Sequence, residues 1–242
     1  MSAVHLRSWA MSHPGMKRKH NEDAYVDRPD LGVWAVADGA GGHHAGEVAS
    51  GMIRESLEAI PPGLSASELL AEVRMRIEAT HAALRTEAQR RGPDVIIAST
   101  VVVMLARNEH FACLWAGDSR AYLLRDGALR QITRDHSLVQ ELVESGAIRP
   151  EDAEHHPRAN VITRAVGADL EEFVLDKVSG RIQAGDRFLL CSDGLCKTVP
   201  EGELAALLSD TAGVPPPQTL VAAALALNAS DNVTAVAVEA TA

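Results

Sequence analysis

The sequence predicts an α+β fold in which helices cover antiparallel β-sheet. Residues 45–60 and 66–91 place apolar side chains at helical spacing, and the second stretch begins at a Ser65-x-x-Glu68 capping box. Residues 95–132 instead carry short apolar runs separated by polar turns, which is the pattern of β-hairpins and therefore of antiparallel sheet. Because the two helices are joined by a short break, we expect them to pack antiparallel across one face of the sheet.

Composition and charge limit the classes of protein that this chain can form. Its 242 residues can bury a core without disulfides and contain no linker-like tract, so we expect one domain over residues 1–242, and a monomer. The formal charge of −10 opposes binding to nucleic acid and to anionic membrane. Three cysteines in apolar runs, no signal-like start and no apolar run of about 18 residues predict a cytoplasmic protein.

The N-terminal segment is predicted to hold two strands that flank a charged loop. The strands cover residues 4–10 and 24–26, and residues 16–23 carry bases followed by acids. A solvated loop with compensating charges would explain most of this stretch. Glu22 and Asp23, however, lie directly before the second strand, which carries one of them to the edge of the core.

A third strand, predicted over residues 33–37, delivers Asp38 into a turn rich in glycine. A carboxylate next to the bare carbonyl of Gly39 offers two hard oxygen ligands that suit Mg²⁺ or Mn²⁺. Asp-Gly is also a favoured hairpin turn, and Asp126-Gly127 between two polar-flanked strands is predicted to be one. The metal interpretation of Asp38 gains weight because acids recur in the same setting further along the chain.

The middle of the chain adds one such acid and a variable segment. Asp118 follows the apolar residues 114–116, and a short helix is predicted over residues 137–145. Residues 149–159 are irregular and include His155 and His156. Adjacent histidines could bind zinc, but no cysteine or spaced third ligand accompanies them, so a mobile surface flap is favoured.

The C-terminal third is predicted to alternate strands and helices. The predicted elements are a strand over residues 187–192, helices over 200–208 and 218–229, and a strand over 233–238. The first of these strands stops at Asp193-Gly194 and repeats the pattern of residues 33–39. Asp231 lies immediately before the last strand.

Acids therefore share one arrangement, each beside a strongly apolar strand: Glu22 or Asp23, Asp38, Asp118, Asp193 and Asp231. Burying these charges together would cost several kcal/mol each unless a cation lies among them. Carboxylates with a glycine carbonyl select hard divalent ions over zinc or iron. Two such ions bridged by one carboxylate can hold a hydroxide and clamp a phosphate for in-line attack.

Covalent routes of phosphate transfer lack their sequence signatures. No cysteine is followed by arginine six positions on, and there is no Asp-x-Asp pair for an aspartyl-phosphate. A Gly-Lys dipeptide for a nucleotide-binding loop and a Gly-x-Ser-x-Gly elbow are also missing. Metal-activated water is the route that remains.

Eight motifs resemble, in order and over nearly the whole chain, those of the PP2C (PPM) family of metal-dependent Ser/Thr protein phosphatases. They are Arg18-x-x-Asn21-Glu22-Asp23-Ala24, Asp38-Gly39-x-Gly41-Gly42-His43, Gly46-Glu47-x-Ala49-Ser50, Trp115-Ala116-Gly117-Asp118-Ser119-Arg120, Thr133-x-Asp135-His136-Ser137, Thr163-Arg164-Ala165-Val166-Gly167, Cys191-Ser192-Asp193-Gly194-Leu195 and Asp231-Asn232-Val233-Thr234. Each motif alone is weak, and eight in order are very specific. The resemblance implies an α-β-β-α sandwich of two antiparallel sheets flanked by helix pairs, with metals in a cleft at one end.

The resemblance also implies roles for individual residues. Asp38 would bridge two Mn²⁺ or Mg²⁺ ions, Gly39 would give its carbonyl, Glu22 would hold one ion, and Asp193 and Asp231 would hold the other. Asp23 would accept a hydrogen bond from metal-bound water, and Asp118 would bind a third, weaker ion. Arg18 would hold the phosphate, because its forked donors suit two phosphate oxygens.

The chain departs from the family pattern at a few positions. Ala40 stands where many eukaryotic members carry a histidine proposed as the general acid, and His43 lies three positions further on. We favour metal-bound water over His43 as the proton source. Ala98 replaces a glycine, which is a matter of packing. The flap, at about residues 137–160, matches the family's variable flap in place only.

The resemblance predicts an enzyme that hydrolyses phosphoserine and phosphothreonine on proteins and so opposes a Ser/Thr kinase. Its expected partners are phosphorylated proteins, such as a kinase or its targets. Two alternatives remain at this point: a pseudophosphatase that keeps the sandwich as a binding module, and a phosphatase of small phosphorylated metabolites.

Overall fold

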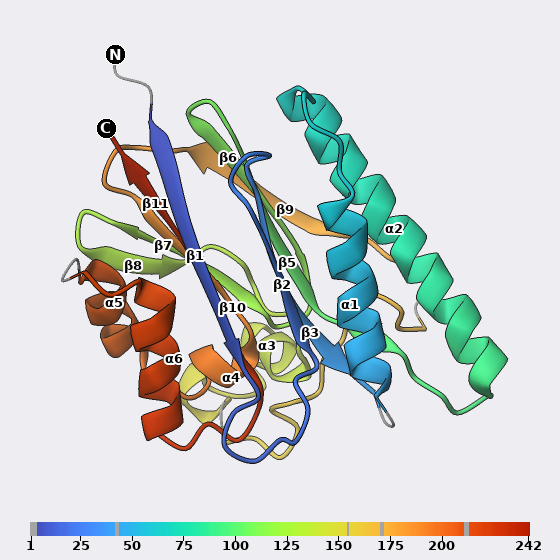
Figure 1. The fold of residues 1–242 in the computed structure, drawn as a ribbon. Helices are drawn as coiled ribbons and strands as arrows, with labels where there is room; N and C mark the ends of the chain where they lie inside the picture. Colours follow the sequence, from blue (N-terminus) through green and yellow to red (C-terminus); the bar gives the residue numbers. More distant parts are fainter. Residues whose placement is uncertain (1–3, 42–43, 154, 170–171, 211–212) are drawn as a thin grey trace.

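Two antiparallel sheets lie face to face, and helices cover both outer faces (Figure 1). The structure is a computed structural model that describes residues 4–41, 44–153, 155–169, 172–210 and 213–242. The first sheet has the strand order β1-β11-β10-β7-β8, and the second has the order β2-β3-β5-β6-β9. The arrangement confirms the predicted α-β-β-α sandwich.

The elements have the following bounds. The first sheet holds β1 (His5–His13), β7 (Arg120–Arg125), β8 (Ala128–Gln131), β10 (Arg187–Cys191) and β11 (Val233–Thr241). The second holds β2 (Asp23–Arg28), β3 (Val33–Ala40), β5 (Val101–Arg107), β6 (His110–Ala116) and β9 (Asp176–Arg181), and β4 (Ala98–Ser99) pairs with β3. The helices are α1 (Ala45–Glu58), α2 (Ala66–Arg91), α3 (Leu138–Glu144), α4 (Asp193–Cys196), α5 (Glu201–Ser209) and α6 (Pro216–Ala226), with a 3₁₀ turn, η1 (Pro150–Asp152).

Strand alternation sorts the apolar side chains into three layers. In β3, Val33, Ala35 and Ala37 pack beneath α1 and α2, whereas Trp34 and Val36 point into the layer between the two sheets. A third layer joins the outer face of the first sheet to α4, α5 and α6. Central strands such as β3, β5, β10 and β11 are therefore buried on both faces, which explains why they appear in the sequence as continuous apolar runs.

The predicted turn and cap are confirmed. Asp126 and Gly127 take φ values of 51° and 78° between β7 and β8, as a two-residue hairpin turn requires. In the capping box of α2, Ser65 N donates to Glu68 Oε2 at 2.8 Å and Glu68 N donates to Ser65 Oγ at 3.3 Å.

Several predicted ends were wrong. β1 runs to His13 and β11 to Thr241 because the two strands pair over their full length. α6 spans Pro216–Ala226 instead of residues 218–229, since proline fits the first helical turn and Asn228 leaves the helix with a φ of 60°.

The prediction that Asp38 lies in a turn was also wrong, because β3 continues through Gly39 and Ala40, which pair with Ser99 and Ala98 of β4. Two elements, besides the short 3₁₀ turn η1, had no predicted counterpart. β9 is an edge strand in which Val178 is the one aliphatic residue, and α4 is a single turn directly after β10. In the described part of the chain, no helix is long and apolar enough to cross a membrane.

Candidate active site

The candidate site lies at one end of the sandwich, where the apolar layer between the sheets becomes polar. Asp38 has the same strand parity as Trp34 and Val36, so it continues their face toward the opposite sheet. Asp23 stands directly opposite Asp38 in the β2–β3 register and shares that face. Two like charges are thus paired across neighbouring strands, which is unfavourable unless a cation or a proton offsets them.

Asp38 is held by its backbone. Its N–H donates to Thr100 Oγ1 at 3.2 Å, and its carbonyl accepts from Thr100 N at 2.9 Å and Ser99 Oγ at 3.0 Å. Burial raises the pKa of its carboxyl well above the usual range, and the charges of neighbouring acids, Asp23 first among them, raise it further. A cation beside this carboxylate would favour its charged form.

Asp23 joins the two sheets. Its Oδ2 accepts hydrogen bonds from Ser192 Oγ at 2.8 Å and from Thr234 Oγ1 at 2.6 Å, both on the first sheet's side of the layer. Burial raises its pKa to about 7, although these two hydroxyls favour the charged form. Its Oδ1 is buried and has no hydrogen-bond partner among the described residues. That oxygen is free to bind a water or another ligand at the site.

Glu22 depends on close backbone packing at the start of α1. Its carbonyl accepts from Gly39 N at 3.1 Å, and its N–H donates to Asn232 Oδ1 at 2.8 Å. A Cβ on Gly46 would lie 2.7 Å from the Gly39 carbonyl carbon and 2.9 Å from the Glu22 carboxyl carbon. Glycine at both positions is what allows β3, α1 and Glu22 to meet.

Asp231 and Arg18 form an ion pair at the mouth of the site. Arg18 Nη2 lies 2.9 Å from Asp231 Oδ2, and the two side chains are 55% and 42% exposed. Asp231 Oδ1 accepts from Asn232 N at 2.9 Å. The guanidinium therefore lies beside the acids on a side chain that is more than half exposed.

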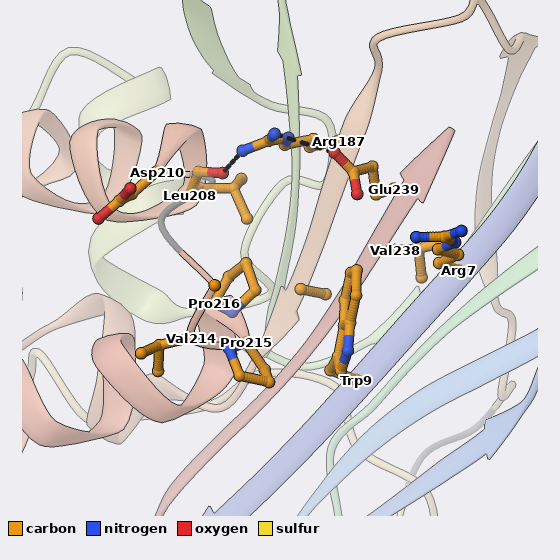
Figure 2. Close-up of a pocket in the computed structure, with 12 residues that line it drawn as sticks. Arg7, Trp9, Arg187, Leu208, Asp210, Val214, Pro215, Pro216, Val238 and Glu239 are labelled. Atoms are coloured by element: carbon orange, nitrogen blue, oxygen red, sulfur yellow. Dashed lines mark hydrogen bonds and ion pairs between the residues drawn. The ribbon is translucent and has the colours of Figure 1, made fainter. Parts of the chain in front are cut away.

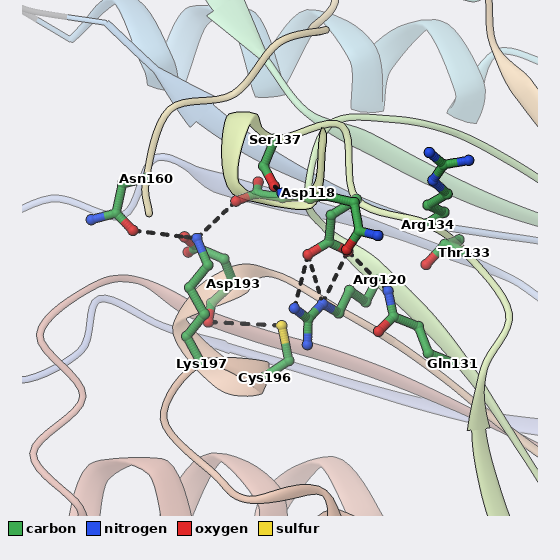
Figure 3. Close-up of polar contacts among 12 residues, drawn as sticks. Asp118, Arg120, Gln131, Thr133, Arg134, Ser137, Asn160, Asp193, Cys196 and Lys197 are labelled. Atoms are coloured by element: carbon green, nitrogen blue, oxygen red, sulfur yellow. Dashed lines mark hydrogen bonds and ion pairs between the residues drawn. The ribbon is translucent and has the colours of Figure 1, made fainter. Parts of the chain in front are cut away.

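A lysine that the sequence interpretation missed joins two of the predicted ligands (Figure 3). Lys197 Nζ lies 2.8 Å from Asp118 Oδ2 and 2.8 Å from Asp193 Oδ2, and 3.4 Å from Asn160 Oδ1. The charges of Asp193 and Asp118 raise its pKa against the opposing effect of burial. The sequence could have predicted the Lys197–Asp193 contact, because the two residues are four apart across a helical turn, but not the Lys197–Asp118 contact.

The predicted residues share one cleft with a volume of about 470 Å³. Its lining includes Arg18, Glu22, Asp38, Gly39, Ala40, Asn160, Asp193, Lys197 and Asp231. Asp118 instead lines a neighbouring cavity of about 340 Å³, to which Asn160 and Lys197 also contribute. None of the described residues lining the cleft is a histidine, and His43 lies outside the described residues.

The donors fit hard divalent cations in kind. Carboxylates and a glycine carbonyl line the cleft, and the buried Asp23 Oδ1 beside it has no partner. As the side chains stand in the described chain, no three His, Cys, Asp or Glu residues form a complete ligand set. Lys197 and Arg18 each contact only the Oδ2 atom, of Asp193 and Asp231 respectively, so an ion could bind the other carboxylate oxygen of each acid with these contacts kept.

A further cavity, of about 260 Å³, is drawn in Figure 2 and shares no lining residue with the cleft. It is lined by Trp9 of β1 and by Pro215 and Pro216 at the start of α6, among others. Its Arg187 donates to the Leu208 carbonyl and pairs with Glu239 at 2.9 Å, which ties α5 to the first sheet. These contacts are structural, and the cavity has no cluster of acids comparable to the cleft.

The comparisons with known proteins define the class of protein. A family model described as Protein phosphatase 2C matches residues 16–227, so the chain belongs to the protein phosphatase 2C family. The family expectation from the eight motifs is confirmed.

Individual relatives are similar over most of the chain. The chain is 37% identical to the serine/threonine protein phosphatase PstP of Mycobacterium tuberculosis, covering 96% of this chain and 44% of that protein. It is 34% identical to the serine/threonine phosphatase stp of Listeria welshimeri, covering 93% and 92% of the two chains. The chain thus spans less than half of the length of the mycobacterial relative.

Solved structures resemble the fold closely. The structure of PppA, described as a key regulatory component of T6SS in Pseudomonas aeruginosa, matches with a TM-score of 0.90 and 44% identity, covering 99% of this chain and 100% of that one. The catalytic domain of PstP in complex with two manganese ions matches with a TM-score of 0.88 and 34% identity, covering 99% and 100%.

Proposed function

We propose that this chain is a divalent-metal-dependent protein phosphatase that hydrolyses phosphoserine and phosphothreonine. The observation that carries the proposal is the cluster of Glu22, Asp38, Asp193 and Asp231 around one open cleft, with Arg18 at its mouth. The named activity of its relatives and the manganese-bound PstP structure support the same conclusion.

The cleft residues would hold two Mn²⁺ or Mg²⁺ ions. Asp38 would contact both ions, Glu22 and the Gly39 carbonyl would complete one site, and Asp193 and Asp231 the other. When bound, such a pair supplies a nucleophile from water at neutral pH and neutralises charge on a phosphate. Rigid placement of Asp38 on β3 favours this role, because three backbone hydrogen bonds fix its position.

Other residues would handle the phosphate and the protons. Arg18 has its guanidinium at the mouth of the cleft and would bind two phosphate oxygens through its fork. Asp23 would accept a hydrogen bond from a water through its unpartnered Oδ1. Ala40 lines the cleft where a general-acid histidine would otherwise stand, so the leaving serine or threonine oxygen would take its proton from water.

The test makes the same substitution, Asp→Asn, at two cleft aspartates that precede a glycine and at one such aspartate in a hairpin turn. Asp38→Asn and Asp193→Asn should abolish turnover of p-nitrophenyl phosphate and of a phosphothreonine peptide, while circular dichroism shows an unchanged fold. Asp126→Asn is the matched control, because Asp126 lies in an exposed hairpin turn where asparagine tolerates the same φ of 51°. Chelation should remove activity and added Mn²⁺ should restore it. Full activity of Asp38→Asn, or after complete chelation, would contradict the proposal.

We also propose phosphoproteins as the substrates, in opposition to a Ser/Thr kinase. The open cleft and the arginine at its mouth support a substrate carried on a protein surface. A binding module without catalysis is disfavoured because every predicted metal acid is present. Turnover of sugar phosphates with inert phosphopeptides would instead favour a phosphatase of small metabolites. The monomeric state and the cytoplasmic location stay predictions.

A further inference from the structure

Asp118 and Asp193 form an acid pair that already has a cation. Asp118 is 1% exposed, and its Oδ2 and Asp193 Oδ2 each lie 2.8 Å from Lys197 Nζ. The sequence resemblance would place a third metal ion at Asp118. The structure puts an ammonium group there.

The lysine satisfies its own hydrogen-bonding capacity at this position. An ammonium carries three donors, and the Asp118, Asp193 and Asn160 oxygens at 2.8, 2.8 and 3.4 Å provide three acceptors. The side chain starts from the end of α4, four residues after Asp193, so its reach to Asp193 is set by the helix. The contact to Asp118 bridges 79 residues of sequence and ties the end of α4 to the segment between β6 and β7.

An ammonium and a divalent ion cannot share these oxygens. Mg²⁺, the larger Ca²⁺ and ions of intermediate size lie about 2.0–2.6 Å from their oxygen ligands. A cation at that distance from both carboxylates would occupy the volume in which Lys197 Nζ lies. Two positive groups in contact would also repel strongly in a largely buried site.

We propose that Lys197 is the resident cation of the Asp118–Asp193 pair and replaces a third divalent ion. This inference rests on the proposed function. It implies that the active site binds two divalent ions and no third. The carboxylate of Asp118 then serves to position Lys197 instead of ligating a metal. Lys197 and Asn160 line both the active-site cleft and the neighbouring 340 Å³ cavity, so the same side chain forms part of the wall between them.

The test counts bound Mn²⁺ directly, by equilibrium dialysis with elemental analysis and by isothermal titration calorimetry on the full chain. The unaltered protein should bind two ions. Lys197→Gln should bind two ions plus a third, weaker one, and Lys197→Gln combined with Asp118→Asn should return to two. Lys177→Gln is the control for charge, because Lys177 is exposed on β9 and should leave the count at two.

Asp118→Asn alone gives a second test that does not depend on the lysine variant folding. It should leave the Mn²⁺ count at two if Lys197 is the cation. Three ions in the unaltered protein, falling to two in Asp118→Asn, would overturn the inference and leave the proposed function intact. A count of two in a folded Lys197→Gln would also overturn it. No bound Mn²⁺ together with no activity would overturn the proposed function itself, and the inference with it.

Discussion

Gly46 offers a sharp test of how the site is built, because the same helix contains a matched control. A Cβ at Gly46 would lie 2.7 Å from both the carbon and the oxygen of the Gly39 carbonyl and 2.9 Å from the Glu22 carboxyl carbon. A Cβ at Gly51, also in α1, would meet nothing within 4 Å. Gly46→Ala and Gly51→Ala therefore make the same chemical change with and without a clash against the proposed metal ligands.

The difference between the two variants isolates the clash. Alanine stabilises a helix interior relative to glycine by about 1 kcal/mol, so Gly51→Ala should raise the free energy of unfolding by up to about that amount. Gly46 lies in the first turn of α1, where this gain is smaller, and overpacking against backbone costs about 1–3 kcal/mol. Gly46→Ala should therefore be about 1–3 kcal/mol less stable than Gly51→Ala.

The clash should also lower the catalytic activity of Gly46→Ala. Relieving a 2.7 Å contact to an ordinary one near 3.4 Å moves the Gly39 carbonyl or α1 by roughly 0.7 Å. Misplacement of about 1 Å costs on the order of 100-fold in rate, so kcat/KM should fall about 10- to 100-fold in Gly46→Ala and stay unchanged in Gly51→Ala. Urea denaturation and phosphopeptide kinetics with Mn²⁺ measure both quantities. Equal stability and equal activity of the two variants would refute this account of the close packing.

Three further predictions concern the phosphate, the pH and a buried ion pair. Arg18→Ala should raise KM for phosphopeptide about 10-fold while unfolding changes by less than about 1 kcal/mol, because its pair with Asp231 is half exposed. Burial lowers the pKa of His81 and of His136 below 6.5, so the unfolded chain takes up protons first and the free energy of unfolding should fall as pH drops through about 6.5; the fall should be less steep in His81→Gln. Arg125→Leu should destabilise by about 2–4 kcal/mol in urea with kcat unchanged, because it strips the buried Asp186 of its charged partner.

Each of these has a clear contrary outcome. An unchanged KM in Arg18→Ala would remove that arginine from the phosphate site. A stability profile of His81→Gln that still falls below pH 6.5 with the original slope would assign the dependence to other groups. An Arg125→Leu variant as stable as the parent would mean that Asp186 is not left uncompensated by the change.

Local sequence patterns were sufficient for most individual elements, whereas the two-sheet sandwich was predicted from the resemblance to the family. Periodic helices, a capping box and the Asp126-Gly127 hairpin turn depend on neighbours in the chain, and all are present, although some helix ends differ from the prediction. β9 escaped prediction for the same reason. Its residues 176–181 are mostly polar, and it is a strand only because the edge of β6 pairs with it.

The acids were predictable because each interrupts a strong apolar run, but their roles depend on contacts across the fold. The bond between Lys197 and Asp118 joins residues 79 apart, and the bonds from Asp23 to Ser192 and Thr234 span 169 and 211 residues. No local pattern encodes such distances. A lysine beside Asp193 is visible in the sequence, but its placement on a second carboxylate is not.

The corrected position of Asp38 has a mechanistic consequence. A carboxylate in a free glycine turn would depend on that turn for its orientation, whereas Asp38 lies within β3, bonded to Thr100 and Ser99 and followed by the paired Gly39. Its side chain continues the inter-sheet face on which Trp34 is packed, so the sandwich core itself aims it between the sheets. Segments that reach the cleft from the flap can then vary in sequence without moving this carboxylate, since none of its backbone bonds comes from them.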